Sequence, residues 1–435
     1  MKERETAIEI LLKTHYENGY ASDLLKNLEA SKENQKEIGF VKKLVYGVLE
    51  EQKALDYFIR EYSNTPFAHL DREILEILRI SIYQYLFMDK VPEYAIVNEA
   101  QELVEKYSED RNKAFVNGIL RNAIRDEISK SDIKLKNKWT RLEVEYSVSK
   151  DLLDLLRKNY SDKTIKKILK SYNYSSDTMI RVNKSKTTKE ELVSLLTEEG
   201  YKLRQHEEVD AVLILENSFG LTETEAFKKG YFTIQDASSV LSAFYADPEK
   251  NMNVLDLCAA PGSKTCQMAE IMNNTGSITA NDLHRNKLRF IEENAERLGA
   301  ENIETASFDG TVFRPEWEKQ FDLVLLDAPC SGTGIISKEP EIKLRRTKEE
   351  TKELVETQKK LIDQAVKYVK KGGYLLYSTC SILSEENEDQ RDYILKHYNV
   401  EGFPLFYKGA ERDYLKIMPY EIDQDGFFIA KFRKL

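Results

Sequence analysis

The sequence has few cysteines and no long apolar run. Four of its 435 residues are cysteines, and none forms a C-x-x-C pair. This spacing is unlike that of a disulfide-stapled secreted scaffold, so we expect no structural disulfide. No stretch approaches 18 consecutive apolar residues, which argues against a transmembrane helix. Residues 1–16 lack the apolar core of a signal peptide, and we predict a cytoplasmic protein without membrane attachment.

Histidine is scarce as well, and no pair has the spacing of a metal site. The five histidines are His15, His69, His206, His284 and His397. Metal sites on a helix usually pair histidines four residues apart with a nearby carboxylate, so we predict no metal. Only His284 follows a predicted site closely, and a surface position on the next helix is the favoured interpretation.

The composition that remains is that of a globular protein with several domains. Hydrophobic residues make up 41% and charged residues 32% of the chain, unlike disordered or fibrous sequences. Its length is roughly two to three times that of an ordinary domain. The net charge of -10 does not exclude RNA, because phosphate binding depends on local basic patches. A monomer is the default expectation.

Helical periodicity dominates the first part of the chain. Apolar positions at this spacing include Ile8, Leu11, Leu12, Leu44, Val45, Val48 and Leu49. Apolar residues that recur three and four positions apart predict amphipathic helices. The polar stretch Ser129–Lys138 is typical of a connector between domains. We therefore predict an all-α helical bundle over residues 1–138.

Residues 139–240 mix helical and strand patterns and are predicted to form a small α+β domain. Leu152–Leu169 has a helical pattern, whereas Thr178–Val182 and Ala211–Leu215 have strand patterns. Gly200 follows another helical pattern, where a glycine commonly ends a helix.

Residues 241–435 alternate short apolar strands with amphipathic helices. The predicted strands are Val254–Leu257, Ser277–Ala280, Leu323–Leu326 and Tyr374–Tyr377. This alternation predicts a parallel, Rossmann-like α/β domain. In such sheets ligands bind at the carboxyl ends of the strands, so the residues that follow the strands are candidates for a site.

The first of these strands runs into Cys258-Ala-Ala-Pro-Gly-Ser-Lys264, a turn of small residues before a helix. Small residues let the backbone approach a ligand, and an acidic residue about 20 positions further on can hold ribose hydroxyls. Asp282, at the end of the next strand, suits that role. Because G-x-G-x-x-G is absent, an ordinary strand-to-helix turn is an alternative at this point.

Two other strands lead into cysteines. One is followed by Asp327-Ala-Pro-Cys330 and the other by Ser-Thr-Cys380. A free cysteine is more often an inert core residue than a nucleophile, and we expect Cys258 and Cys266 to pack beside or line the turn. The positions of Cys330 and Cys380 beyond strand ends favour a reactive role for that pair.

Two thiols beside an adenosine-type cofactor suit the methylation of cytosine at carbon 5. That carbon is a weak nucleophile, but a thiolate that adds to carbon 6 makes the ring enamine-like. A second group must then help to remove the proton on carbon 5 and release the thiol. Asp327 can hydrogen-bond the ring and stabilise the accumulating charge. These residues alone do not rank the two thiols.

The motifs resemble the bacterial Sun/Fmu (RsmB) family of 16S ribosomal RNA cytosine-C5 methyltransferases over nearly the whole chain. The similarity includes the turn, both cysteine motifs, Gln235-Asp236-Ala-Ser-Ser and Asp425-Gly-Phe-Phe428. Leu44-Val-Tyr46 and Val116-Asn117-Gly-Ile-Leu120 are similar to the NusB-like RNA-binding domain of that family. The resemblance implies a NusB-like bundle, a small α+β domain and a Rossmann-like class I methyltransferase domain, with S-adenosyl-L-methionine as cofactor and 16S rRNA as partner.

The resemblance also implies roles for single residues. Cys380 would be the nucleophile, Cys330 would promote release, and Asp327 would serve both catalysis and the cofactor site. The cofactor-binding residues that it implies are Cys258, Ala259, Ala260, Pro261, Gly262, Ser263, Lys264, Asp282, Asp309 and Asp327. The chain departs from the family at Ser263, where a glycine is common, and at Ser147–Lys150, where Ser-His-Pro is common.

RNA contacts are predicted at two places. Lys343, Arg345 and Arg346 belong to a basic run after the Pro-Cys motif. Arg181 and Asn183 match a segment of the family's small domain. For the basic run, a solvated helix face is the alternative interpretation.

Two other functions are alternatives to an RNA cytosine-C5 methyltransferase. One is a noncatalytic RNA- or protein-binding factor, and the other is a methyltransferase that acts on DNA or a small molecule. Intact Asp327, Cys330 and Cys380 argue against the first. The similarity to an RNA-binding domain argues against the second.

Overall fold

The computed structural model describes residues 2–17, 19–31, 35–108, 111–173, 177–421 and 425–435. Contacts divide the chain into two compact units. The first consists of Met1–Tyr174 and Ile336–Thr347, and the second of Ser175–Ile335 and Lys348–Leu435. The boundaries predicted at residues 138 and 240 stay predictions.

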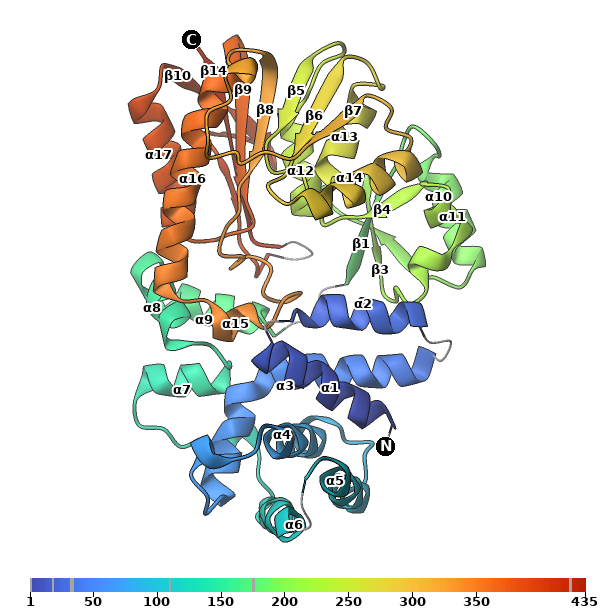
Figure 1. Cartoon of the computed structure of the whole chain (residues 1–435), viewed down its shortest axis with the longest axis vertical. Helices are drawn as coiled ribbons and strands as arrows, with labels where there is room; N and C mark the ends of the chain where they lie inside the picture. Colours follow the sequence, from blue (N-terminus) through green and yellow to red (C-terminus); the bar gives the residue numbers. More distant parts are fainter. Residues whose placement is uncertain (1, 18, 32–34, 109–110, 174–176, 422–424) are drawn as a thin grey trace. The chain divides into compact units, whose positions relative to one another are not determined.

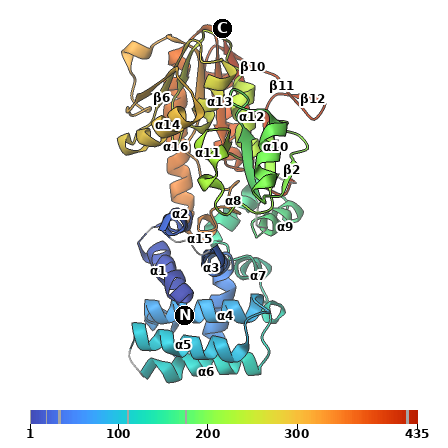
Figure 2. The same cartoon turned by 90° about the vertical axis from the view of Figure 1, so that its right-hand side faces the viewer.

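The first unit is built from helices. These are α1 (Lys2–Tyr16), α2 (Ala21–Ser31), α3 (Gln35–Tyr62), α4 (Arg72–Phe87), α5 (Glu93–Tyr107), α6 (Arg111–Arg125), α7 (Lys138–Glu145), α8 (Lys150–Asn159), α9 (Asp162–Ser171), α15 (Ile342–Arg345) and the 3-10 turns η1 (Phe67–His69) and η2 (Lys130–Asp132). Figure 2 shows α4, α5 and α6 side by side. Leu44, Val45 and Leu78 are fully buried in the core, which confirms the predicted helical bundle.

The helical pattern predicted over Leu152–Leu169 is confirmed. The structure has two helices, α8 and α9, in this stretch. The hydroxyl of Ser149 accepts a hydrogen bond from the N–H of Leu152, and that of Ser161 accepts one from the N–H of Thr164. A serine at the N-cap satisfies amides that a helix leaves unpaired, so the second serine starts a new helix.

The second unit contains a small antiparallel sheet in the order β2-β3-β1-β4. Its elements are β1 (Thr178–Val182), α10 (Lys189–Glu198), β2 (Leu203–Gln205), β3 (Val212–Leu215), η3 (Leu221–Glu223), α11 (Glu225–Lys228) and β4 (Phe232–Ile234). Ile180 pairs with Leu213 on one side and Ile234 on the other. The predicted strands are confirmed, and Gly200 follows the end of α10 with a φ of 91°.

The larger sheet of this unit has the order β10-β14-β9-β8-β5-β6-β7, with β13 paired to β14. Its elements are α12 (Ala237–Ala246), β5 (Asn253–Asp256), α13 (Ser263–Ile271), β6 (Ser277–Asn281), α14 (Arg285–Leu298), β7 (Ile303–Ala306), η4 (Pro315–Trp317), β8 (Phe321–Asp327), α16 (Lys348–Tyr368), β9 (Val369–Thr379), η5 (Ser384–Glu386), α17 (Glu388–His397), β10 (Val400–Phe403), β13 (Leu415–Ile417) and β14 (Phe427–Lys434). The strands β11 (Leu405–Tyr407) and β12 (Ala410–Arg412) form a separate hairpin.

The four predicted strands of this domain are confirmed, and β5 to β9 are parallel. The antiparallel strands β10, β13 and β14 are an addition that the sequence did not predict. Alternate residues of the central strands face opposite sides, because side chains alternate along a strand. Leu323 and Leu325 pack in the cluster that includes residues of α12 and α13, whereas Val324 packs in the cluster that includes residues of α16. Figure 1 shows these helices beside the sheet.

The position of β5 decides where a ligand can bind. It lies between β6, which follows it in the chain, and β8, so the order of the strands reverses at this point. Open α/β sheets bind ligands at the carboxyl ends of strands beside such a reversal. None of the helices in the described part of the chain has an apolar stretch long enough for a bilayer.

Candidate active site

The turn after β5 joins the strand to α13 and carries most of the predicted cofactor residues. Gly262 has a φ of 98°, a conformation that residues with a side chain rarely adopt. A Cβ at this position would lie 3.0 Å from the Cα of Ile291 on α14. Glycine is therefore needed for the turn and for its packing. Ser263 is the first residue of α13, so this departure from the family lies just beyond the positive φ.

Acidic residues follow the next two strands. Asp282, after β6, accepts hydrogen bonds from the N–H of Ala260 at 3.3 Å and from the N–H of His284 at 2.9 Å. Asp309, after β7, accepts from the hydroxyl and the N–H of Thr311, and these bonds hold its pKa below the ordinary value. Asp282 is thus bonded to the turn itself, and both carboxylates lie at the carboxyl end of the sheet.

Burial raises the pKa of three groups in and around the turn. Asp256 is 1% exposed, and burial raises its pKa to about 7. Its Oδ2 accepts a hydrogen bond from the hydroxyl of Thr265 at 2.7 Å, whereas its Oδ1 has no partner among the described residues. Burial also raises the pKa of Cys258 well above the ordinary value and that of Cys266 to about 12. Cys258 and Cys266 are therefore protonated thiols near neutral pH, which makes them poor nucleophiles.

Lys264 connects the turn to the end of β8. Its Nζ lies 2.7 Å from Oδ2 of Asp327, and the hydroxyl of Ser378 on β9 donates to Oδ1 at 2.7 Å. Although burial lowers the pKa of Lys264, the Asp327 carboxylate raises it above the ordinary value, and Cys380 adds to this attraction. Lys264, Asp327 and Ser378 come from three chain segments and are joined in one network near Cys380.

The two predicted catalytic cysteines meet in space. The sulfur atoms of Cys330 and Cys380 lie 3.2 Å apart, although 50 residues separate them in the chain. Both residues are partly exposed. The hydrogen bond with Cys380, together with burial, raises the pKa of Cys330 well above the ordinary value. Cys330 is therefore held as a thiol next to the other sulfur.

The C-terminal motif that begins at Asp425 packs against these loops. The N–H of Gly426 donates to the carbonyl of Gly334 at 2.9 Å, and the N–H of Gly334 donates to the carbonyl of Cys380 at 2.9 Å. A Cβ on Gly334 would lie 2.0 Å from the oxygen of Gly426, so this approach requires glycine. The Nζ of Lys264 lies 5.6 Å from the centre of the Phe427 ring. The motif therefore forms one wall of the site.

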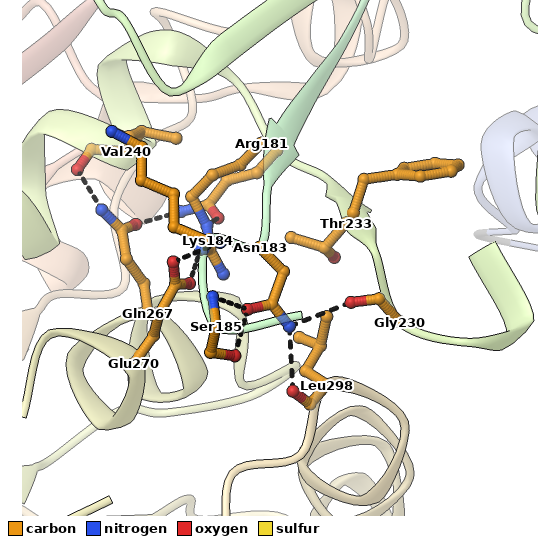
Figure 3. A network of polar contacts seen from close by, with 12 residues as sticks. Arg181, Asn183, Lys184, Ser185, Gly230, Thr233, Val240, Gln267, Glu270 and Leu298 are labelled. Carbon is orange, nitrogen blue, oxygen red and sulfur yellow. Dashed lines mark hydrogen bonds and ion pairs between the residues drawn. The ribbon is translucent and has the colours of Figure 1, made fainter. Parts of the chain in front are cut away.

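Arg181 and Asn183, which were predicted to contact RNA, are each 2% exposed. Arg181 forms an ion pair with Glu270 of α13 (Figure 3). Its Nε also donates to the side-chain oxygen of Gln235 at 2.9 Å. The amide of Asn183 donates to the carbonyls of Gly230 and Leu298, each at 2.9 Å (Figure 3). The polar groups of both side chains are bonded within the protein, so both residues stabilise the fold of the second unit.

The basic run lies in the segment that belongs to the helical unit. Lys343 is 0% exposed, and its Nζ donates to the carbonyls of Glu50 and Tyr146 and to the side-chain oxygen of Asn173. Burial lowers the pKa of Lys343 to about 8. Arg345 donates to the carbonyl oxygens of Thr14 and Gly19.

The sequence predicts RNA contacts for this run, with a solvated helix face as the alternative. For Lys343 both interpretations are wrong, because its side chain is fully buried. Periodicity and charge do not reveal that a segment packs among helices. Arg345 and Arg346 are partly exposed.

Three residues of the site were missed in the sequence. Ser378 and Thr265 bind the carboxylates of Asp327 and Asp256. Glu386 is fully buried and binds both cysteine loops. Ser378 lies within a quoted motif and Thr265 directly follows one, but serine and threonine are too common to stand out. Glu386 follows Cys380 by six residues, and no pattern distinguishes it from its neighbour Glu385. Within the described ranges, no cluster of three His, Cys, Asp or Glu side chains could hold a metal.

Three family models match the chain. A model described as 16S rRNA methyltransferase RsmB/F matches residues 243–433. A NusB family model matches residues 1–125, and a ferredoxin-like domain model of RsmF/B-like methyltransferases matches residues 150–222.

Individual proteins are similar over different lengths. The chain is 33% identical to the probable ribosomal RNA small subunit methyltransferase B of Bacillus subtilis (strain 168), over 99% of this chain and 98% of the relative. It is 35% identical to a 28S rRNA (cytosine-C(5))-methyltransferase of Mus musculus, over 66% of this chain and 39% of that protein. The crystal structure of PH0851 has a TM-score of 0.84 and 27% identity, and it covers 100% of this chain and 98% of its own.

Proposed function

Because the chain belongs to the RsmB/F family of rRNA methyltransferases, we propose that it transfers a methyl group from S-adenosyl-L-methionine to carbon 5 of a cytosine in 16S rRNA. The predicted family and fold class, with a NusB-like bundle, a small α+β domain and a methyltransferase domain, are confirmed. The chain is therefore an enzyme. The observation that most supports the chemistry is the 3.2 Å contact between the sulfurs of Cys330 and Cys380.

The residues at the carboxyl end of the sheet fit S-adenosyl-L-methionine. The turn Cys258–Lys264 offers backbone close to the ligand, and Asp282 and Asp309 offer carboxylates for ribose hydroxyls. Leu283 is 58% exposed beside Asp282, so it presents apolar surface that an adenine ring can cover. When bound, this cofactor supplies an electrophilic methyl group.

Cys380 is the proposed nucleophile. Its sulfur forms a bond to carbon 6 of cytosine, and the electron pair displaced from the ring double bond makes carbon 5 nucleophilic. Lys264 remains an ammonium beside this sulfur, because the attraction of Asp327 and of Cys380 raises its pKa. An ammonium has three N–H donors, and the bond to Asp327 uses one. The others can stabilise negative charge on the sulfur or on the ring.

Asp327 orients the groups around the base. Its two oxygens are held by Lys264 and by Ser378, and its side chain is 27% exposed. A carboxylate that is fixed in this way can accept a hydrogen bond from the exocyclic amine of cytosine. We assign Asp327 this positioning of the base.

Cys330 is the proposed release group. After methyl transfer, a base removes the proton from carbon 5, the ring double bond re-forms, and Cys380 leaves as a thiolate. The S–H of Cys330 lies within hydrogen-bonding distance of that sulfur. Because the pKa of Cys330 is raised, it keeps its proton and can stabilise the departing sulfur.

We propose fewer RNA-contacting residues than the sequence predicts. Arg345 and Arg346 remain candidates for phosphate contacts, since their side chains are partly exposed. Lys343, Arg181 and Asn183 are omitted because each is buried. The cytoplasmic location and the monomeric state stay predictions.

A methyl-transfer assay tests the reaction class. The protein is incubated with radiolabelled S-adenosyl-L-methionine and unmodified 16S rRNA, and with DNA in a parallel reaction. We expect label in RNA as 5-methylcytosine. Label in DNA alone would establish the DNA alternative, and absence of label in either would favour a noncatalytic binding protein.

A trapping experiment tests the order of the thiols. Cys330→Ala should accumulate a covalent protein–RNA adduct of reduced gel mobility, because release is impaired after Cys380 has added. Cys380→Ala and the double variant should form none. An adduct with Cys380→Ala and none with Cys330→Ala would exchange the two roles and leave the cofactor assignment intact.

A further inference from the structure

A buried carboxylate lies behind the two thiols. Glu386, the last residue of the 3-10 turn η5, is 0% exposed. Its Oε1 accepts hydrogen bonds from the N–H of Ser331 at 2.8 Å and from Nε2 of Gln358 at 3.0 Å. Its Oε2 accepts from the hydroxyl of Ser331 at 2.5 Å and from the hydroxyl of Ser381. Four donors thus converge on one side chain.

The two serines directly follow the two cysteines. Ser331 comes after Cys330, and Ser381 comes after Cys380. Their hydroxyl oxygens also lie 3.2 Å from each other, and the hydroxyl oxygens of Thr333 and Ser381 lie 3.1 Å apart. The same carboxylate is therefore bonded to both cysteine loops, one residue away from each sulfur-bearing position.

The carboxylate is itself held in place. The hydroxyl of Tyr377 donates to the carbonyl of Glu386 at 2.6 Å. The next residue, Asn387, donates to the carbonyl of Ser381 at 2.8 Å and accepts from the hydroxyl of Thr379 at 2.6 Å. Anchors on both sides prevent the side chain from swinging away, and a buried polar network with all its members bonded is rigid.

We propose that Glu386 is a positioning residue that clamps the Cys330 loop to the Cys380 loop and so sets the distance between the two sulfurs. It does not touch the substrate. Its catalytic consequence rests on the proposed function, because release requires Cys330 to reach Cys380. The clamp itself is a property of the folded chain and can be tested without RNA.

The carboxylate is suited to this task by charge and length. Hydrogen bonds to an ionised acceptor are about twice as strong as neutral ones. Glutamine keeps the length of the side chain but replaces one acceptor oxygen by an amide donor. In one orientation this donor faces the N–H groups of Ser331 and Gln358, and in the other it faces the hydroxyls of Ser331 and Ser381. Glu386→Gln should therefore loosen the clamp without leaving a cavity. Glu385→Gln is the matched control, because it makes the same substitution on the same turn at a side chain that is partly exposed.

Disulfide formation measures the distance between the sulfurs. Full-length protein without RNA is treated with diamide, which takes two electrons and two protons from the thiols as the S–S bond forms. The disulfide between Cys330 and Cys380 is quantified by mass spectrometry of the linked peptides. Alkylation of each cysteine by iodoacetamide is followed in parallel and reports thiol reactivity. The ratio of the two rates isolates proximity from reactivity.

We expect this ratio to fall about tenfold in Glu386→Gln, the effect of weakening roughly one charge-assisted hydrogen bond. Glu385→Gln should match the unmodified protein. An unchanged ratio in a folded Glu386→Gln protein overturns the clamp.

A second variant keeps the test decisive. If near-ultraviolet circular dichroism shows that Glu386→Gln is unfolded, the double variant Ser331→Ala and Ser381→Ala takes its place. It keeps the carboxylate with its bonds to Gln358 and to the N–H of Ser331, and it removes both hydroxyl arms. The same fall in the ratio is expected, and an unchanged ratio overturns the proposal.

Kinetics separate this inference from the proposed function. In Glu386→Gln, kcat for RNA methylation should fall while KM for RNA and for S-adenosyl-L-methionine stays unchanged, because neither binding surface is altered. If the unmodified protein does not methylate RNA, the proposed function fails and the disulfide ratio still decides the clamp. If methylation proceeds but the ratio is insensitive to Glu386, the clamp fails alone.

Discussion

Lys264 and Asp327 form an ion pair with 2.7 Å between Nζ and Oδ2, across the carboxyl ends of the neighbouring strands β5 and β8. Lys264 belongs to the turn predicted to hold the cofactor, whereas Asp327 lies three residues before Cys330. The pair therefore joins the proposed methyl-donor site to the proposed base site. The pair also gives Lys264 a role beside the proposed catalytic groups, which its sequence motif did not predict.

Loss of this cation should affect turnover more than cofactor binding. In Lys264→Met, Asp327 loses its counter-ion and Cys380 loses an adjacent positive charge, so we expect kcat to fall about 100-fold. The affinity for S-adenosyl-L-methionine, measured by calorimetry, should change only a few-fold. Lys352→Met, on the exposed face of α16, is the control. A loss of affinity as large as the loss of kcat would return Lys264 to a purely cofactor-binding role.

Cys330 and Cys380 should differ in reactivity. Because the hydrogen bond with Cys380 and burial raise the pKa of Cys330 above its ordinary value of 9.0, its thiolate should be scarce up to and beyond pH 9. Iodoacetamide at pH 7.5 should therefore label Cys380 before Cys330, as read by peptide mass spectrometry. In Cys380→Ser the sulfur partner is gone, and labelling of Cys330 should become faster. Preferential labelling of Cys330 in the unmodified protein would argue against its role as the protonated release group.

Asp256 should make stability depend on pH in an unusual direction. Burial raises its pKa from 3.8 in the unfolded chain to about 7. Between these values the folded state binds more protons than the unfolded state, so the free energy of unfolding falls as pH rises from about 4 to about 7. The loss levels off above pH 7 and amounts to about 4 kcal/mol at most.

Asp256→Asn removes this titration and provides the comparison. Chemical unfolding of both proteins from pH 4.5 to 8 gives the difference in stability, in which the other titrating groups cancel. The unmodified protein should lose stability relative to Asp256→Asn across that range, and the loss should level off above pH 7. A constant difference would mean that the carboxyl is not buried as described.

Lys343 should matter for stability and not for RNA binding. Lys343→Met removes the buried ammonium that donates to Glu50, Tyr146 and Asn173, and this loss of hydrogen bonds should cost about 2 kcal/mol of unfolding free energy. The slope of RNA affinity against salt concentration should stay unchanged. Arg346→Met is the contrasting variant, because loss of one phosphate contact lowers that slope by about one unit. An equal change of slope in both variants would contradict this division.

The sequence by itself determined the local features of the protein. Strand patterns predicted β5, β6, β8 and β9 because a buried parallel strand must be apolar along its length. The turn at Gly262 could be predicted because the need for a small residue in a tight turn comes from the local backbone geometry, here a positive φ. Since parallel strands bring their carboxyl ends to one edge, the convergence of Cys330 and Cys380 also followed from the pattern.

Only the tertiary structure decided which polar side chains face inward. Arg181 and Lys343 look like surface cations in the sequence, yet each is buried among partners distant in the chain. Glu386 resembles its neighbour Glu385 but binds both cysteine loops. Burial of a charge depends on whether distant segments supply donors or acceptors that offset its loss of water, and no local pattern contains that information.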